Sequence, residues 1–278
     1  MAKIIDFRMR PPIEAYQGLF NPAFCDRANR IMGATTSPSC KHVGEEQGMK
    51  LFLEEMEQAE IDIGVMNGRQ MAGVDANDEV LADMEKRYPG RFFSFACTNL
   101  SKPMDEILRG IEIAVRQLGL RGVTCEPGFS PSPMYPDDER MFPIYEKCLE
   151  LEVPVLFMTG FFCGPDIGWN DPVRFDRVAG AFPRLQMVMG HGCYPYVTQA
   201  IGLACKRTNV YLSPDCYMFL PGGDMYIKAP ALDDQLIFGT AYPFRPLVQT
   251  VRETKQFPMS KEAMEKYLYG NAAKLLKL

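Results

Sequence analysis

Two arginines, Arg8 and Arg10, stand two positions apart in the first apolar segment of the chain. Residues 3–10 alternate with the period of two that is typical of a β-strand, so Asp6 shares one face with both arginines. Guanidinium groups sheltered from water bind carboxylates through paired hydrogen bonds. We therefore expect at least one of the two arginines to bind an anion. The alternative is that both form structural ion pairs with Asp6, Glu126 or Asp215.

His191 is the main candidate for moving a proton. It follows a short apolar run and stands between Gly190 and Gly192. A neutral imidazole can act as a general base or acid near neutral pH, although an isolated histidine is more often a structural residue. Asp215 and Glu126 also follow apolar runs. Either could orient His191, activate water or pair with an arginine.

Further polar side chains follow apolar runs and could contact a substrate. The candidates for substrate binding are Arg69, Thr159 and Tyr242, and Arg245 could join them. Cys193 is close to His191 in sequence, but neighbouring residues on a turn seldom face each other, so we do not expect a thiol nucleophile.

Short apolar runs alternate with amphipathic segments along the whole chain, which predicts alternating strands and helices. The predicted strands are 3–10, 61–67, 92–98, 122–125, 153–158, 185–190, 210–213 and 236–240. The predicted helices are 49–59, 77–88 (ending before Pro89-Gly90), 104–118, 137–152, 172–182 (capped by Asp171), 195–207, 246–256 and 260–276. This order predicts an α/β fold, a (β/α)8 TIM-type barrel with a single domain over residues 1–278. An open doubly wound sheet is the alternative, but no Gly-rich phosphate loop follows the first strand.

In such a barrel the active site lies at the carboxyl ends of the strands. We expect Ile5, Phe7 and Met9 to pack against helices, and the face that carries Arg8 and Arg10 to point inward. Residues 11–44 form a long polar insert with many glycines and prolines. This insert is either a lid over the site or a surface loop.

The composition is that of a soluble protein. The chain has 278 residues, 23% of them charged, and a net charge of −5, which gives no attraction to nucleic acid or to an anionic membrane. Its apolar runs are far shorter than the roughly 20 residues of a membrane span. The first residues do not resemble a secretory signal, and the nine cysteines form no C-x-x-C pair. We therefore expect free thiols and a cytoplasmic location.

Five segments of the chain, in order, resemble motifs of the amidohydrolase-related family. They are 5–11 (IDFRMRP), similar to I-D-x-H-x-H; 154–160 (PVLFMTG), similar to P-V-x-x-H-T-G; 189–192 (MGHG), similar to the strand-six histidine segment; 238–244 (FGTAYPF), similar to G-[ST]-D-Y-P-[FW]; and 270–276 (GNAAKLL), similar to G-N-A-x-R-L-[LF]. The family contains metal-dependent hydrolases and nonoxidative decarboxylases, and a few lactonases and isomerases that work without metal. The resemblance implies an enzyme built on a (β/α)8 barrel.

According to this resemblance, most metal-ligand positions of the family have changed. Arg8 and Arg10 stand at the paired histidines, Met158 at the strand-five histidine and Ala241 at the strand-eight aspartate; only His191 keeps a ligand-type side chain. Arginine stays protonated and repels a cation, and a catalytic zinc normally needs about three protein ligands. We expect no tightly bound metal, while a weakly bound divalent ion at His191 is left open.

We therefore expect a hydrolase that acts, without a tightly bound metal, on a small carboxylate such as a lactone or a ring-derived acid. The arginines would bind the carboxylate and stabilise developing negative charge, and His191 with Asp215 or Glu126 would transfer the proton. The missing strand-eight aspartate weighs against this expectation, since in the family it commonly serves as the base toward water. The alternatives are a decarboxylase, another lyase or an isomerase acting on an unsaturated or aromatic acid, and a non-catalytic barrel that binds an anion. Many barrels of this family associate, which favours a homo-oligomer.

Overall fold

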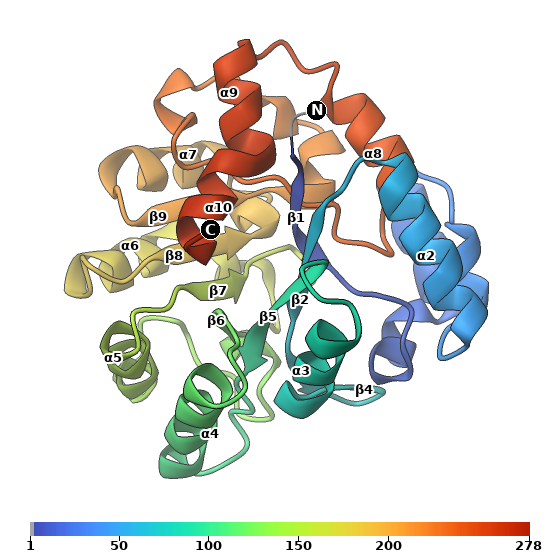
Figure 1. The fold of residues 1–278 in the computed structure, drawn as a ribbon. Coiled ribbons are helices and arrows are strands. Elements are labelled where there is room, and N and C mark those ends of the chain that lie inside the picture. Colours follow the sequence, from blue (N-terminus) through green and yellow to red (C-terminus); the bar gives the residue numbers. More distant parts are fainter. Residues whose placement is uncertain (1–2) are drawn as a thin grey trace.

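Parallel strands form the centre of the molecule, and helices surround them (Figure 1). The structure is a computed structural model and describes residues 3–278. Seven strands pair in chain order, and each pair is parallel. They are β1 (Ile5–Met9), β2 (Ile63–Asn67), β5 (Phe92–Cys97), β6 (Gly122–Cys125), β7 (Val155–Met158), β8 (Met187–Gly190) and β9 (Val210–Ser213).

Residues 235–240 take the eighth position, between β9 and β1. The N–H of Ile237 donates to the carbonyl of Leu212 on β9 at 2.9 Å, and the N–H of Phe7 on β1 donates to the carbonyl of Phe238 at 3.0 Å. The barrel is therefore nearly closed, and the predicted (β/α)8 architecture is confirmed. The predicted strand 236–240 is present only as this hydrogen-bonded segment, which forms one isolated bridge to β9.

The Asp6 carboxylate explains why regular pairing stops in this segment. Oδ1 of Asp6 accepts the N–H groups of Thr240 and Arg8, both at 3.0 Å, and Oδ2 accepts the Thr240 hydroxyl at 2.6 Å. A side chain thus replaces the backbone acceptor that a strand partner would supply. Burial raises the pKa of Asp6 to about 7, although these hydrogen bonds act in the opposite direction.

A bulge in β1 changes the faces expected for its side chains. Ile5 and Phe7 were expected to pack against the surrounding helices. They instead join a buried cluster inside the barrel, with side chains from strands all round it and from the C-terminal residues 272–276. The register of β1 against β2 shifts between Asp6 and Met9. Such a shift by one residue moves the following side chains to the opposite face. The strict alternation was therefore wrong for Ile5 and Phe7, whereas Met9 does pack in the cluster between sheet and helices.

The predicted helices are present, with bounds that differ by a few residues. They are α2 (Glu46–Gln58), α3 (Asp78–Arg87), α4 (Met104–Arg116), α5 (Phe142–Glu150), α6 (Pro172–Ala181), α7 (Val197–Lys206), α8 (Leu247–Thr254), and α9 (Lys261–Glu265) and α10 (Asn271–Leu276), which a π-helical turn joins. The predicted cap Asp171 accepts the N–H of Val173 at 3.0 Å. Within residues 3–278, no helix has both the length and the apolar composition needed to cross a bilayer.

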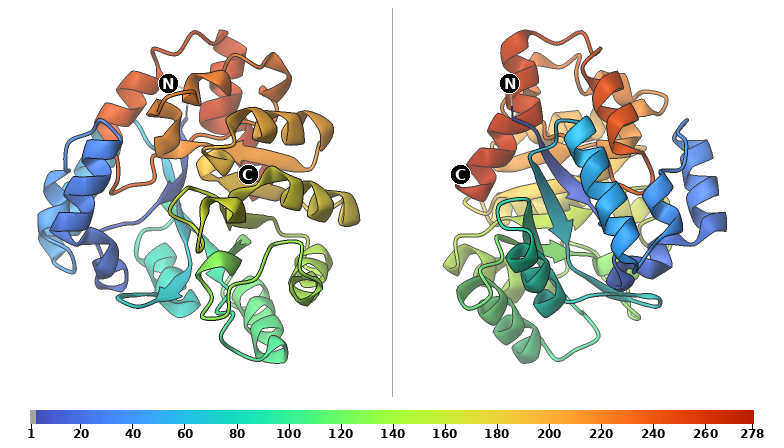
Figure 2. Two further views of the ribbon diagram at one scale, coloured as in Figure 1. Left: turned by 180° about the vertical axis from the view of Figure 1, so that it is seen from behind. Right: turned by 45° about the vertical axis from the view of Figure 1, so that its right-hand side comes forward.

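The insert 11–44 contains a helix, α1 (Pro22–Ile31), which the sequence did not predict. Asn21 caps it by accepting the N–H of Ala23 at 3.1 Å, and a proline follows at the first helical position. One face of α1 is buried against residues that follow β9 and the eighth segment, including Tyr217 and Phe244. In Figure 2 this blue segment lies beside α2. The insert is therefore packed on the carboxyl ends of the strands.

Two further strands form a hairpin outside the barrel sheet. A short antiparallel hairpin, β3 (Arg69–Met71) and β4 (Val74–Ala76), follows β2 and was not predicted from the sequence. Its turn contains Gly73 with φ of +77°, a backbone conformation that favours glycine.

All nine cysteines lie in the described part of the chain and are free thiols, as predicted.

We predict that Asp6→Asn flattens the pH dependence of stability. The folded-state pKa of Asp6 is about 7 against a usual value of 3.8, so the folded protein binds more protons than the unfolded chain between these limits. The unfolding free energy of the wild type should therefore fall relative to the variant as the pH rises from about 4 to about 7, by about 1.4 kcal/mol for each pH unit within that window. Denaturant unfolding at several pH values measures this difference. Parallel curves for the two proteins would contradict the assignment.

Candidate active site at the mouth of the barrel

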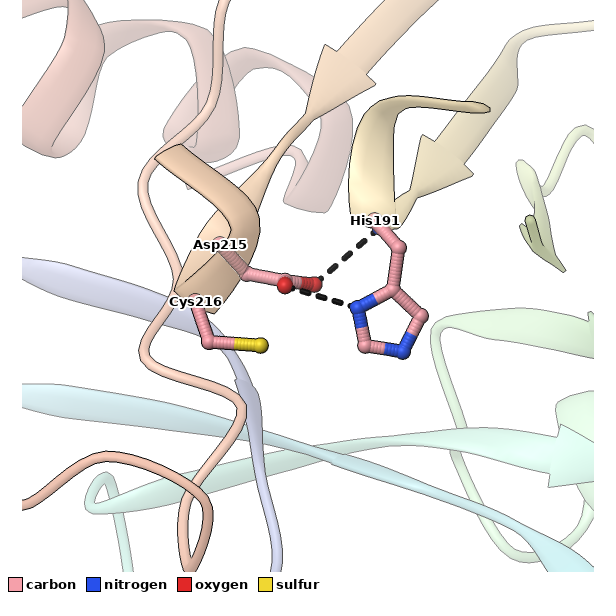
Figure 3. A group of neighbouring side chains, drawn as sticks. All are labelled: His191, Asp215 and Cys216. Carbon is pink, nitrogen blue, oxygen red and sulfur yellow. Dashed lines mark hydrogen bonds and ion pairs between the residues drawn. The ribbon is translucent and has the colours of Figure 1, made fainter. Parts of the chain in front are cut away.

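Side chains from three strand ends meet at one end of the barrel. Arg8 belongs to β1, His191 follows β8, and Asp215 and Cys216 follow β9. All four are buried, and His191, the most exposed, has an exposed fraction of only 5%. Figure 3 shows His191, Asp215 and Cys216 directed toward one another. We call these four residues the strand-end cluster, and it lies where barrel enzymes build their active sites.

His191 and Asp215 form a hydrogen-bonded pair. Nδ1 of His191 lies 2.7 Å from Oδ1 of Asp215, and the backbone N–H of His191 donates to Oδ2 at 3.1 Å. Because a carboxylate can only accept, the proton is on Nδ1 and the lone pair is on Nε2. Burial, followed by the charge of Arg8, lowers the pKa of His191 to about 3. The imidazole is therefore neutral. Its Nε2 can accept a proton, and its one N–H, on Nδ1, is bonded to Asp215.

The Arg8 guanidinium lies against both members of this pair. Its Nη1 is 3.1 Å from Oδ2 of Asp215 and 2.9 Å from Nδ1 of His191, and it also contacts Nε2. Burial opposes ionisation of Asp215, but His191 and Arg8 outweigh it and lower the pKa of Asp215. The cluster thus holds one positive and one negative charge. The expected alternative, a structural pair between Arg8 and Asp215, is realised in part.

Strained backbone fixes the direction of these side chains. His191, Cys193 and Asp215 have φ of 69°, 62° and 45°, in the left-handed region that costs about 1–3 kcal/mol for a residue other than glycine. Gly192 has φ of +61°, and a Cβ atom there would lie 2.8 Å from the Tyr226 hydroxyl. That hydroxyl donates to the Gly192 carbonyl at 2.7 Å. The turn after β8 is therefore held in one conformation, as is typical of functional sites.

Thr159 also holds this turn. Its hydroxyl donates to the carbonyl of Gly190 at 2.6 Å and accepts the N–H of Cys193 at 2.8 Å. The side chain is fully buried, so Thr159 positions the turn that carries His191, and the substrate contact expected of it stays a prediction.

The structure does not bring the side chain of Tyr242 to the cluster. The chain turns at Ala241, which has φ of 55°, and the Tyr242 ring packs 5.0 Å from the ring of Phe52 on α2. Its hydroxyl is bonded to that of Ser39 in the insert. Tyr242 therefore joins the insert to the barrel, and the substrate contact expected of its hydroxyl is not available in this geometry.

Arg10 is a buried cation without a carboxylate partner. Its exposed fraction is 3%, and among residues 3–278 no carboxylate lies within 4.0 Å of it. Nη1 donates at 3.4 and 3.3 Å to the carbonyls of Ala241 and Tyr242, and the guanidinium lies 5.2 Å from the centre of the Phe244 ring. Burial, followed by the charges of Arg8 and Arg69, lowers its pKa to about 9. An anion would relieve this unbalanced charge.

Arg69 and Glu126 are paired with each other. Nε of Arg69 donates to Oε2 of Glu126 at 2.7 Å, and Nη2 bonds to Oε1. The Arg69 guanidinium also lies 5.1 Å from the centre of the Phe129 ring. This two-point pair occupies Glu126, so the proton transfer considered for Glu126 and the substrate contact considered for Arg69 both require the pair to open.

Aromatic rings join the cluster to Arg10. The Tyr217 ring lies 4.5 Å from His191 and 4.9 Å from Phe161. Phe24 of α1 lies 5.4 Å from Phe244, the ring next to Arg10. The insert therefore contributes to the wall of the site. A cavity of about 1110 Å³ lies elsewhere, between the insert, the β3–β4 hairpin and α3, and no residue of the cluster lines it.

Three residues of the cluster are close enough to hold a metal ion. Ligand atoms of His191, Asp215 and Cys216 all lie within 4.8 Å of one another. However, the Arg8 cation is bonded to two of these residues, and burial raises the pKa of the Cys216 thiol well above its usual value. This donor set does not fit a dication while Arg8 is in place.

Sequence reasoning missed some residues of this site. Cys216 and Tyr217 directly follow Asp215, and this adjacency was the only signal for them. Phe244 follows the eighth segment, but a phenylalanine after a strand is usual in a core. The thiol of Cys193 is buried, and burial raises its pKa to about 12.

Comparisons with known proteins identify relatives of the whole barrel. A family model described as Amidohydrolase matches residues 45–278. An uncharacterised TIM-barrel protein of Bordetella bronchiseptica has a similar crystal structure, with 36% sequence identity, a TM-score of 0.92, and coverage of 99% of this chain and 98% of that chain. No curated protein matches the chain.

Two decarboxylases share the fold at lower identity. A 2,6-dihydroxybenzoate decarboxylase from Rhizobium has 16% identity and a TM-score of 0.70, covering 100% of this chain and 99% of that chain. A dihydroxybenzoic acid decarboxylase from Polaromonas sp. JS666, with bound manganese and the inhibitor 2-nitroresorcinol, has 17% identity and a TM-score of 0.69, covering 100% and 98%. At these identities the similarity shows the fold alone.

We predict that the His191 imidazole stays neutral, with its proton on Nδ1, from pH 5 to pH 8. The reason is its burial beside Arg8, which lowers its pKa to about 3. Long-range ¹⁵N–¹H NMR spectra measure the state of both ring nitrogens, and His42→Gln removes the only other histidine signal. A titration of His191 with a midpoint near 6.5 would refute the prediction.

Proposed function

Because the chain belongs to the amidohydrolase family, we propose that it is an enzyme, and specifically a hydrolase that cleaves an ester or lactone bond in a small carboxylic acid without a tightly bound metal. The observation that carries this proposal is the buried guanidinium of Arg10, which has no carboxylate partner within residues 3–278. It lies in the same barrel mouth as a neutral imidazole oriented by a carboxylate. A buried cation calls for an anion, and an oriented neutral imidazole is a general base.

The proposed reaction gives each polar group of the site a role. The substrate carboxylate accepts hydrogen bonds from Arg10, and the carbonyl oxygen of the scissile bond accepts from Arg8, which frees Nε2 of His191. Nε2 removes a proton from water as the oxygen of that water bonds to the carbonyl carbon. Arg8 stabilises the resulting oxyanion. When the carbon–oxygen bond breaks, the leaving oxygen takes the proton back from His191, and Asp215 stabilises the imidazolium in between.

This use of His191 replaces the strand-eight aspartate that the family commonly uses as the base toward water. Ala241 stands at that position, and the methyl group cannot accept a proton. The His191–Asp215 pair supplies the missing base from β8 and β9.

Decarboxylation of an aromatic acid is the second candidate. It is favoured by the aromatic rings around the mouth and by the decarboxylase activity of two proteins with this fold. Decarboxylation requires an acid that protonates the carbon left by carbon dioxide. The one proton of the neutral His191 ring lies on Nδ1 and is bonded to Asp215, so no acid is positioned for this step, and we rank this reaction below hydrolysis.

We predict that Arg10→Met weakens binding of benzoate about 10- to 150-fold, since a hydrogen bond to a charged group contributes about 1.5–3 kcal/mol. Binding of neutral benzamide should change little. Isothermal titration calorimetry measures both. The matched control is Arg140→Met, which removes an exposed arginine that is paired only with Asp138. Equal benzoate affinity in the wild type and Arg10→Met would overturn the role of Arg10.

We further predict that a panel of lactones bearing a carboxylate contains a substrate, and that chelator treatment does not abolish its turnover. His191→Ala should lower kcat about 10²- to 10⁴-fold, the usual contribution of a general base. Absorbance follows lactone opening, and carbon dioxide release from dihydroxybenzoates is measured in parallel. Release of carbon dioxide would favour the second candidate. Near one equivalent of zinc or manganese, with activity lost on its removal, would overturn the metal-free proposal.

A further inference from the structure

We infer that the Arg8 guanidinium stands in the place of a metal ion, and that removing it uncovers a divalent-cation site formed by His191, Asp215 and Cys216. This inference rests on the metal-free state proposed above. It concerns a capacity of the cluster that Arg8 conceals, and it makes no claim about the substrate.

The position of Arg8 is the first argument. One imidazole nitrogen, one carboxylate oxygen and the Cys216 sulfur lie within 4.8 Å of one another, and in Figure 3 the sulfur and the ring face the same space. Nη1 of Arg8 contacts the carboxylate and both ring nitrogens. A single nitrogen thus contacts two of the three potential ligands, His191 and Asp215.

The charges provide the second argument. At present Arg8 and Asp215 form a buried ion pair of zero net charge, and His191 and Cys216 add no charge to it. A dication added beside Arg8 would leave excess positive charge in a buried site, which is costly. If Arg8 is removed and the thiol releases its proton to solvent, the dication is balanced by two negative charges, one on Asp215 and one on the Cys216 thiolate. The exchange therefore conserves the charge of the buried cluster.

The ligand types provide the third argument. One imidazole nitrogen, one carboxylate oxygen and one thiolate sulfur are donors that zinc and cobalt accept in tetrahedral sites. Three protein ligands leave the fourth position to water. The space that the arginine side chain vacates lies directly beside these donors, so the ion needs no new opening in the barrel.

The test is a titration of purified Arg8→Ala with cobalt(II) chloride. We expect one equivalent to bind, with visible absorption of tetrahedral cobalt and a near-ultraviolet thiolate-to-cobalt band. The wild type should show neither band. Arg8→Lys keeps a cation in the cluster and should also bind no cobalt, and Arg10→Ala, which removes a neighbouring arginine but leaves Arg8, should behave as the wild type.

Double variants identify the ligands. Arg8→Ala with Cys216→Ser should lose the near-ultraviolet band, and Arg8→Ala with His191→Ala should lose the binding. If Arg8→Ala is unstable because Asp215 has lost its partner, zinc should raise its melting temperature and should not raise that of the double variant with His191→Ala. Folded Arg8→Ala that binds no cobalt, or a spectrum unchanged in both double variants, would overturn the inference.

The outcomes also separate this inference from the proposed hydrolase. Cobalt binding by Arg8→Ala, together with a wild type that turns over no lactone, would support the concealed metal site and remove the hydrolase. One equivalent of metal already present in the cluster of the wild type would overturn both the metal-free proposal and this inference.

Discussion

The buried ion pair between Arg8 and Asp215 is the interaction on which the site depends. It joins β1 to the turn after β9 across the eighth segment, and it orders the imidazole that lies against it. Neither charge is exposed to water, so removing one partner would leave the other uncompensated, which typically costs about 3–5 kcal/mol. A second arginine, Arg10, has no such partner in the part of the chain that the structure describes. The mouth of the barrel therefore carries an excess of positive charge, which Arg10 supplies.

The same strand closes the barrel and supplies the charges, and the two tasks are connected by a bulge. Asp6 replaces backbone acceptors toward the eighth segment, and the register shift after Asp6 then allows Arg8 to reach His191. With strict alternation Phe7 and Met9 would point one way, and Arg8 the other. The bulge in β1 is thus required for Arg8 to reach the site, in agreement with the frequent occurrence of bulges beside active sites.

Much of the architecture could be predicted from the sequence, because strand and helix periods and helix-capping signals are local. The barrel, the order of its elements and the meeting of Arg8, His191 and Asp215 at strand ends follow from these signals and from parallel strand order. The bulge could not be predicted, since it depends on the pairing of β1 with β2. Helix α1 was missed because its sequence is polar and its burial depends on the distant ring of Phe244. The pairing of Arg69 with Glu126 and the outward direction of Tyr242 likewise depend on tertiary contacts.

The insert ties itself to the barrel at several points, and one of them has a kinetic consequence. Arg245 donates to the carbonyl of Met32, next to the end of α1, at 2.6 Å, and its guanidinium also bonds to Glu253 of α8. Residues of the cluster below are buried, so a molecule arriving from solvent reaches them only when this cover loosens. Under the proposed function, the residence time of product would then be set by a contact remote from the chemistry. The maximal rate of the enzyme would then be limited by movement of α1 away from the barrel and not by the chemical step.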